Sequence, residues 1–164
     1  MIEYKISKSK QDFADAKDLF VEYANSLNFE LCFQKFDEEI SNLPEQYSEP
    51  TGCIILCYED KKPIGCVGLR KFGEDICEMK RLYLRKEARG KGTGRMLAEK
   101  VIAKAKEFGY KKIQLDTIET MKEAIALYKS MRFKEISPYR FNPVKGVIYM
   151  ELELSATADT KNVE

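Results

Sequence analysis

Residues 76–108 read ICEMKRLYLRKEARGKGTGRMLAEKVIAKAKEF, and this stretch decides the fold that the sequence predicts. Its first ten residues have the apolar pattern of a strand, and residues 93–108 carry apolar side chains at helical spacing. Three glycines stand at alternate positions between them: Gly90, Gly92 and Gly94. A glycine lets the backbone turn sharply and lets a ligand approach it, and a helix that begins there directs free N–H groups at one point. The junction is therefore either an anion site or a tight turn with solvated cations.

The glycine spacing excludes two common phosphate-binding motifs. A nucleoside-triphosphate loop needs GxxxxGK followed by Ser or Thr, which the chain does not contain. A dinucleotide fingerprint needs GxGxxG after the first strand of a βαβ unit, whereas the glycines here form GxGxG late in the chain. Neither motif accounts for the junction.

The length and composition predict one ordinary domain. The chain has 164 residues, of which 44% are apolar and 34% are charged, enough for a single core. Its 28 Lys and Arg residues nearly balance its 27 Asp and Glu residues, so its net charge of +1 favours neither nucleic acid nor an acidic membrane as a partner. The start of the chain has no signal-peptide pattern, and we expect a cytoplasmic protein.

The cysteines are expected to be reduced and buried, and no metal site is expected. They form no CxxC pair and lie mostly in apolar runs: Cys32, Cys53, Cys57, Cys66 and Cys77. The chain contains no histidine, so the commonest metal ligand and the usual neutral-pH base are missing. A metal site at Cys53 and Cys57, or a cysteine nucleophile, stays open as the alternative.

The order of the predicted elements gives the fold class α/β (α+β), with a mixed sheet covered on both faces. Helices are predicted at 11–28, at 34–43 ending before Pro44, at 93–108, and after a cap at Thr117 or Thr120. Strands are predicted at 2–7, in a hairpin within 51–72, at 76–85, at 111–117, and in a brief and a closing strand near the end. Residues 1–154 form the expected domain, and 155–164 are expected to be a flexible tail.

The pattern R-x-x-G-x-G at Arg89, Gly92 and Gly94, between a strand and a long helix, resembles the GNAT family of acyl-CoA-dependent N-acetyltransferases. The later stretch AIALYKSMRF at 124–133 carries the same resemblance, which runs from about residue 54 to residue 154. It implies a central sheet of about six or seven strands flanked by about four helices. It also implies acetyl-CoA as co-substrate.

The resemblance assigns coenzyme A to particular residues. The signature that holds the pyrophosphate would comprise Arg89, Gly90, Lys91, Gly92, Thr93, Gly94 and Arg95. The backbones of Leu82, Tyr83 and Leu84 would hold the pantetheine arm and the thioester oxygen. Met121 stands where many members have an asparagine that binds this arm, and Arg132 stands where they have a glycine.

The resemblance also implies two catalytic residues. Tyr128 would give a proton or a hydrogen bond to the leaving thiolate, although periodicity alone favours a core tyrosine on the helix stripe. Glu78 would accept the proton of the amine, because it has the same pleat parity as Leu84 if no bulge intervenes. The alternatives for Glu78 are an ion pair with Lys80 or Arg81, with water chains serving as the base.

The expected activity is transfer of the acetyl group to a primary amine of a small metabolite, amino acid or peptide, by direct attack in a ternary complex. Arg140 is a candidate for holding a carboxylate of the acceptor. A non-catalytic acyl-CoA sensor and an enzyme for another acyl group are the alternatives. Acetyl-CoA and the unidentified amine are the expected partners, without nucleic acid or membrane, and a homodimer stays open.

Overall fold

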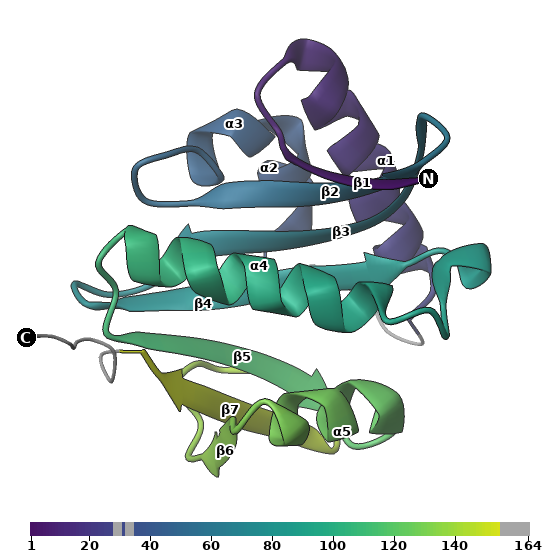
Figure 1. Ribbon diagram of the computed structural model, residues 1–164. Coiled ribbons are helices and arrows are strands. Elements are labelled where there is room, and N and C mark those ends of the chain that lie inside the picture. Colours follow the sequence, from purple (N-terminus) through teal and green to yellow (C-terminus); the bar gives the residue numbers. More distant parts are fainter. Residues whose placement is uncertain (28–30, 32–34, 155–164) are drawn as a thin grey trace, which may run out of the picture.

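The computed structural model describes residues 1–27, 31 and 35–154, which form one seven-stranded mixed sheet with helices on both faces (Figure 1). The strands are β1 (Ile2–Ile6), β2 (Cys53–Glu59), β3 (Lys62–Lys71), β4 (Ile76–Leu84), β5 (Lys112–Ile118), β6 (Lys134–Ile136) and β7 (Val147–Glu153). The helices are α1 (Lys10–Asn25), α2 (Phe36–Ser41), α3 (Leu43–Gln46), the 3-10 helix η2 (Lys86–Ala88), α4 (Thr93–Glu107) and α5 (Lys122–Ser130). The predicted fold class and the single domain are confirmed.

The strands lie in the order β1-β2-β3-β4-β5-β7-β6. All neighbours are antiparallel except β4 and β5, which are parallel because α4 crosses over between them. The predicted hairpin turns at Asp60 and Lys61, both of which have positive φ. Two such residues form the tight turn whose twist suits antiparallel strands.

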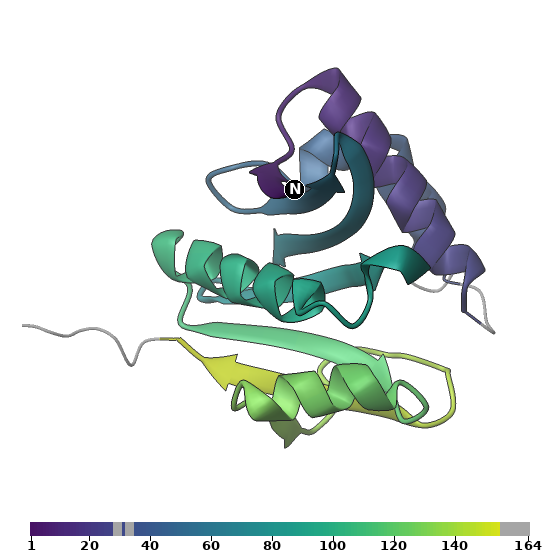
Figure 2. The same cartoon turned by 45° about the vertical axis from the view of Figure 1, so that its right-hand side comes forward.

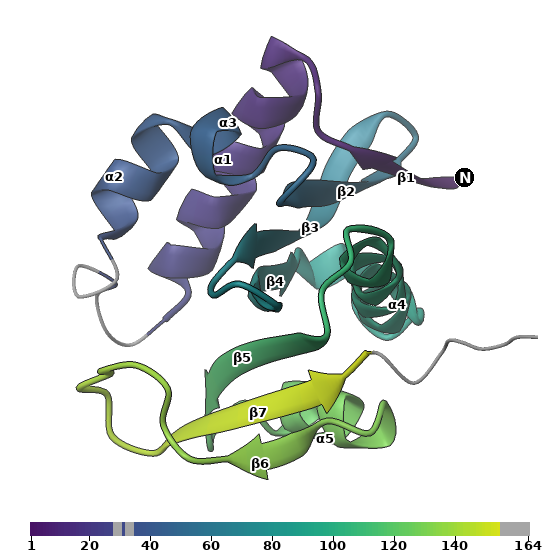
Figure 3. The same cartoon turned by 90° about the vertical axis from the view of Figure 1, so that its left-hand side faces the viewer.

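Each face of the sheet has its own apolar cluster. Figure 3 shows α1, α2 and α3 on one face of the sheet and α4 and α5 on the other. Figure 2 shows that α4 and α5 lie side by side on their face, with β5 running between them. Leu97 and Val101 of α4 pack with Met79 on one face, whereas Leu19 and Phe20 of α1 pack on the other. The two clusters make the sheet the central layer of the domain.

The helix ends follow local rules in most places. Ser9 and Asp12 form a capping box at the start of α1, and Gly109 takes the expected left-handed conformation after α4. The predicted threonine cap of α5 is wrong, because the cap residue is Met121 and no side chain bonds there. The helix predicted at 34–43 is two short helices instead, with Pro44 in the first turn of the second, where its missing N–H costs nothing.

A bulge in β4 breaks the expected alternation of side chains. Between Cys66 and Gly68 of β3, the partner residues on β4 change from Tyr83 to Lys80, so β4 carries one extra residue. Arg81 lies in this interval with a φ of 61°. The parity argument that placed Glu78 with Leu84 is therefore wrong, because it required a regular strand.

The described cysteines are buried and free, as expected: Cys53, Cys57, Cys66 and Cys77. Burial raises the pKa of Cys53 to about 12. Cys32, the start of the helix predicted at 34–43, and the tail at 155–164 lie outside the described residues. Within 1–27, 31 and 35–154, no helix is long and apolar enough to cross a membrane, and no group of three Cys, Asp or Glu residues is placed to hold a metal ion.

Candidate active site

A cleft opens where β4 and β5 separate. The two strands pair at only three positions, the last joining Glu78 to Gln114, and beyond it the edge of β4 that faces β5 has no ladder partner. Backbone groups that Leu82 and Tyr83 turn to that side can therefore meet a ligand. The cleft is lined by residues of α1, β4, the glycine loop, β5 and α5: Tyr23, Ser26, Met79, Arg81, Leu82, Tyr83, Leu84, Arg89, Gly90, Gly94, Leu115, Asp116, Thr117, Thr120, Met121, Lys122, Glu123, Ala124, Leu127 and Tyr128.

The glycine loop ends the cleft at the start of α4. Gly90 and Gly92 have φ values of 78° and 80°, a conformation that side-chain-bearing residues rarely adopt. Gly92 is the cap residue of α4 and supplies no side chain to its first amides, which leaves them for an anion. Arg89 donates from Nε to the carbonyl oxygen of Leu84 at 3.0 Å, which ties the loop to the end of β4.

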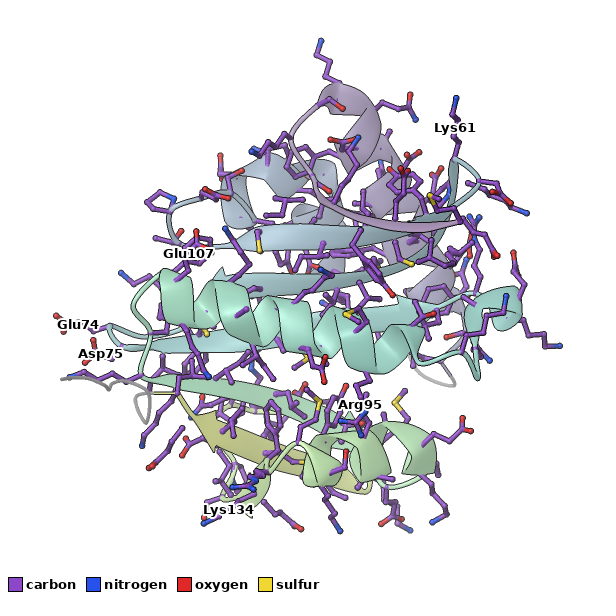
Figure 4. The ribbon with its side chains drawn as sticks, in the orientation of Figure 1. Lys61, Glu74, Asp75, Arg95, Glu107 and Lys134 are labelled. Carbon is purple, nitrogen blue, oxygen red and sulfur yellow. The ribbon has the colours of Figure 1, made fainter. Side chains whose placement is uncertain are left out.

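Four residues of the predicted signature do not line the cleft with their side chains. Lys91 lies 3.7 Å from a carboxylate oxygen of Glu59, and Thr93 is buried. Gly92 has no side chain to offer, and Arg95 donates to the hydroxyl of Ser130 at 2.5 Å. Figure 4 shows Arg95 between α4 and α5. The side-chain atoms in the cleft at this end come from Arg89, while Gly90 and Gly94 contribute backbone.

Tyr128 reaches the cleft from the opposite wall, on α5. It is 7% exposed and packs against the ring of Phe133, with ring centroids 5.6 Å apart. Burial raises the pKa of Tyr128, and the neighbouring Tyr23 and Asp116 raise it further. Its phenol is therefore protonated at neutral pH and can act as a donor.

Met121 also lines the cleft, at the start of α5. Its sulfur accepts a contact of 3.5 Å from the hydroxyl of Thr117. Met121, which stands where the resemblance implies an asparagine, therefore presents an apolar side chain to the cleft, and Thr117 near the end of β5 contacts its sulfur.

A smaller pocket continues the cleft toward the α1 face. It shares with the cleft Tyr23, Met79, Arg81, Asp116, Thr117 and Met121. The residues that it adds are Leu31, Lys80, Ile118 and Asn142. Asp116 stands at the junction and accepts a hydrogen bond of 3.2 Å from Asn142 Nδ2.

Glu78 lies outside both spaces. It is fully buried, and its Oε2 accepts a hydrogen bond of 2.8 Å from the hydroxyl of Tyr139. Its Oε1 accepts one of 2.6 Å from Arg140 Nη2 and lies 3.5 Å from Arg70 Nε. With both oxygens engaged and no lining contact, Glu78 belongs to a buried ion-pair cluster, and its role as general base stays a prediction that these contacts do not favour.

Arg140 belongs to the same buried cluster. Its guanidinium binds Glu78, lies over the rings of Phe72 and Tyr139, and lines neither pocket. Its position between these groups leaves it directed at the protein interior. The expected contact of Arg140 with an acceptor carboxylate does not follow from this geometry.

The bulge that shapes the cleft is held by a second ion pair. Arg81 Nη2 lies 2.7 Å from Glu39 Oε1, and Arg81 Nε lies 3.1 Å from Glu39 Oε2. Tyr47 donates to the same carboxylate at 2.9 Å, and all three residues are buried. A bidentate pair of this kind orients the backbone that carries it.

The sequence reasoning missed Asp116, Asn142 and Lys80. An acidic residue near the end of the strand beside the signature strand is the signal that would have found Asp116. Lys80 interrupts a predicted strand with a charge, which is also visible in the sequence. Asn142 lies in a loop and comes near Asp116 only through folding, so nothing local marks it.

Comparison with known proteins gives the same architecture. A model of the Acetyltransferase (GNAT) family matches residues 16–133. The chain is 39% identical over 150 residues to an uncharacterized N-acetyltransferase of Schizosaccharomyces pombe, covering 90% of this chain and 92% of that protein. A GNAT acetyltransferase structure from Staphylococcus aureus has a TM-score of 0.78 at 19% identity, covering 94% of this chain and 99% of that one. A Salmonella typhimurium protein solved with its cofactor acetyl-CoA has a TM-score of 0.68 at 14% identity, covering 99% of each chain.

Proposed function

This chain belongs to the GNAT acetyltransferase family, and from that premise we propose that it transfers the acetyl group of acetyl-CoA to a primary amine of a small metabolite, amino acid or peptide. The single observation that carries the proposal is the continuity of one cleft from the glycine loop to Tyr128 and on to Asp116. It joins an anion-binding helix start, an unpaired strand edge, a phenol and a carboxylate. Those are the groups that transfer from a diphosphate-bearing thioester to an amine requires.

The glycine loop and β4 would bind acetyl-CoA. The first amides of α4 and the guanidinium of Arg89 suit the pyrophosphate. The unpaired edge of β4 at Leu82, Tyr83 and Leu84 suits the pantetheine arm, and an amide there would stabilise the oxygen that becomes negative. The bound structure from Salmonella typhimurium supports acetyl-CoA as the ligand of this fold.

Tyr128 would act as the acid. The amine nitrogen attacks the thioester carbon, the tetrahedral intermediate expels the thiolate, and the phenol donates its proton to the sulfur. The nitrogen loses a proton as it becomes the amide, and a proton returned to the phenolate, directly or through water, restores Tyr128. A neutral phenol is required for this step; a tyrosine is neutral at pH 7 even with its ordinary pKa, and burial, which raises the pKa of Tyr128, keeps it neutral at higher pH as well. None of the four described cysteines lines the cleft, which supports direct attack in a ternary complex.

Asp116 would take the place of Glu78 as proton acceptor. It lies at the junction of the cleft and the smaller pocket, where an amine entering from the α1 face meets the thioester. Asn142 donates to one of its oxygens, Oδ2, so the carboxylate is oriented. An acceptor ammonium would lose its proton to Asp116 directly or through a water molecule before attack.

The test is release of free coenzyme A from acetyl-CoA with a panel of amines, with the acetylated product identified by mass. We expect Tyr128→Phe to lower kcat by about 10- to 100-fold while leaving acetyl-CoA affinity unchanged. Tyr110→Phe is the matched control, because Tyr110 is also buried but donates to the carbonyl of Thr51 and lines no part of the cleft. Equal activity of the two variants would remove Tyr128 from the mechanism.

Asp116→Asn tests the base independently. It preserves the size of the side chain and removes its ability to accept a proton. We expect kcat to fall by about 100-fold. The loss should shrink as the pH approaches the pKa of the amine, because free amine then no longer needs deprotonation. A loss that does not change with pH would contradict the assignment.

A further inference from the structure

The outer edge of β1 has backbone groups that no strand of the sheet uses. β1 is the outermost strand at one end of the sheet, and among the described residues only β2 pairs with it (Figure 1). The carbonyl oxygen of Met1 accepts a hydrogen bond of 3.3 Å from the amide of Asp60, and the amide of Ser7 donates one of 2.9 Å to the carbonyl of Ile54. Odd-numbered residues of β1 therefore bond to β2. Because these groups alternate in an antiparallel ladder, the even-numbered residues turn theirs outward.

A groove runs beside this edge on the α4 face. It has a volume of about 540 Å³, and its lining includes Tyr4 and Ile6 of β1 and Ala103 of α4. Tyr4 and Ile6 are half-buried, so part of each stays in contact with solvent. An open strand edge is a template for another strand, and the groove leaves room for side chains that would come with it.

The side chains of β1 alternate in a way that makes the strand complementary to itself. Residues 2–6 read Ile-Glu-Tyr-Lys-Ile, and the three apolar side chains pack against the cluster on the α4 face. Lys5 lies on the opposite face, where its Nζ is 2.9 Å from Asp12 Oδ1, and Glu3 shares that face by alternation. Both charged side chains of β1 are exposed, and Glu3 forms no ion pair among the residues that the structure describes.

We propose that two copies of the chain associate by antiparallel pairing of their β1 strands about a two-fold axis at Tyr4. Tyr4 then lies opposite Tyr4 of the second copy and Ile2 lies opposite its Ile6, so the outward backbone groups bond to each other. Glu3 lies opposite Lys5 of the second copy, in a pair without backbone bonds, where side chains are closest. The two sheets become one continuous sheet.

Charge favours this register over its neighbours. A slip by two residues in either direction keeps the outward backbone groups paired, but it sets Glu3 opposite Glu3 or Lys5 opposite Lys5. Like charges directly opposite each other are destabilising. The register centred on Tyr4 is also the one that pairs the whole length of both strands.

A different occupant of this edge would be an acidic extended segment of another protein. Lys8 and Lys100 line the groove, and neither forms an ion pair with a carboxylate in the part of the chain that the structure describes. Lys100 lies over the ring of Tyr4, 5.1 Å from its centroid. The alternation of Glu3 and Lys5 matches a second copy rather than a uniformly acidic segment, and the experiment distinguishes the two.

Sedimentation velocity of the full chain over about 10–500 µM measures the association, because short strands make a small interface that dissociates at low concentration. Glu3→Lys sets like charges opposite each other twice in the dimer, and we expect it to raise the dissociation constant at least about tenfold. The matched control is Glu135→Lys, the same charge reversal at an exposed position of β6, the strand at the other end of the sheet. It should leave the association unchanged.

Mixing two variants tests the register itself. Lys5→Glu should also associate poorly alone, but together with Glu3→Lys it forms a heterodimer in which opposite charges again face each other at both positions. The equimolar mixture should therefore associate within about threefold of wild type. Because Lys5→Glu loses the ion pair with Asp12, its fold is checked by circular dichroism, and Glu3→Lys against Glu135→Lys decides the interface without it.

Three results would each overturn the inference. The first is a wild-type chain that stays monomeric at about 500 µM, and binding of a glutamate-rich peptide by that monomer would assign the edge to the acidic segment instead. The second is equal association of Glu3→Lys and wild type, which would place the interface elsewhere. The third is a mixture of folded variants that associates no better than its components.

Discussion

Replacing Glu78 by glutamine separates a structural role of this residue from a catalytic one. The carboxylate is fully buried and receives hydrogen bonds of 2.8 Å from Tyr139 and 2.6 Å from Arg140. Removing one partner of a buried ion pair costs roughly 3–5 kcal/mol, because the other charge stays buried without compensation. Glutamine keeps one oxygen as an acceptor, so we expect the lower end, about 3 kcal/mol.

The assay is urea unfolding followed by far-UV circular dichroism, with kcat measured on the folded protein. A loss of about 3 kcal/mol in a domain of this size corresponds to a fall in melting temperature of roughly 6–12 °C. We expect kcat at low temperature to stay within about threefold of wild type, since Glu78 lines neither pocket. Combining Glu78→Gln with Lys80→Met should destabilise less than Glu78→Gln alone, because the second change removes a cation from the same cluster.

The opposite pattern would refute this reasoning. If Glu78→Gln kept wild-type stability and lost about 100-fold or more in kcat, the carboxylate would be the base. The hydrogen bonds to Tyr139 and Arg140 would then have to open during turnover.

Three further predictions test single features of the chain. Arg132 has a φ of 75° after α5, so Arg132→Gly should raise the unfolding free energy by about 1 kcal/mol, and a lower melting temperature would contradict this. Gly92→Ala should weaken acetyl-CoA binding by about tenfold in calorimetry, whereas Gly109→Ala, with a φ of 90° and similarly open surroundings, should lose similar stability and keep the affinity. Burial raises the pKa of Asp12, but its ion pair with Lys5 and two backbone amides prevail and lower it to about 2. Because folding lowers the pKa of Asp12 from 3.8, its carboxylate stabilises the folded protein by about 2 kcal/mol above pH 3.8, and this stabilisation is lost as the pH falls toward 2. The difference in unfolding free energy between wild type and Asp12→Asn should therefore shrink over that pH range. A difference that stays constant would count against the assigned ion pair.

The parts of the fold that the sequence predicted depend on neighbours in the chain. Three elements follow from apolar spacing and turn residues within a short window of sequence. They are the hairpin at Asp60 and Lys61, the helix that ends before Gly109, and the strand before the glycine loop. The cap of α5 was missed because Thr117 and Thr120 both have the right chemistry, whereas the chain turns at Met121 instead. Capping preferences therefore narrowed the start of α5 to a few residues but did not identify the cap residue.

The parts that could not be predicted depend on contacts between distant residues. The left-handed backbone of Arg81 is unfavourable for an arginine, and its side chain is held by Glu39 on a different element. Without the bulge, alternation would put Glu78 on the same face as Leu84. One long-range ion pair therefore accompanies both the bulge beside the cleft and the failure of the parity argument for Glu78.

In the proposed function, the separation of β4 and β5 would let the two substrates be recognised by different chemistry. On the α4 and α5 face the opening meets a glycine loop, a helix start and apolar side chains, which suit a long carrier held largely by backbone. On the α1 face it meets Lys80 and Asn142, with Asp116 at the junction, which suits a small charged acceptor. Because Arg81 lines both spaces and its bulge lies between them, a change that straightened β4 should weaken both binding steps together. A change confined to Lys80, which lines the smaller pocket and not the cleft, should leave the affinity for acetyl-CoA unchanged, and this contrast would distinguish the two ends of the opening.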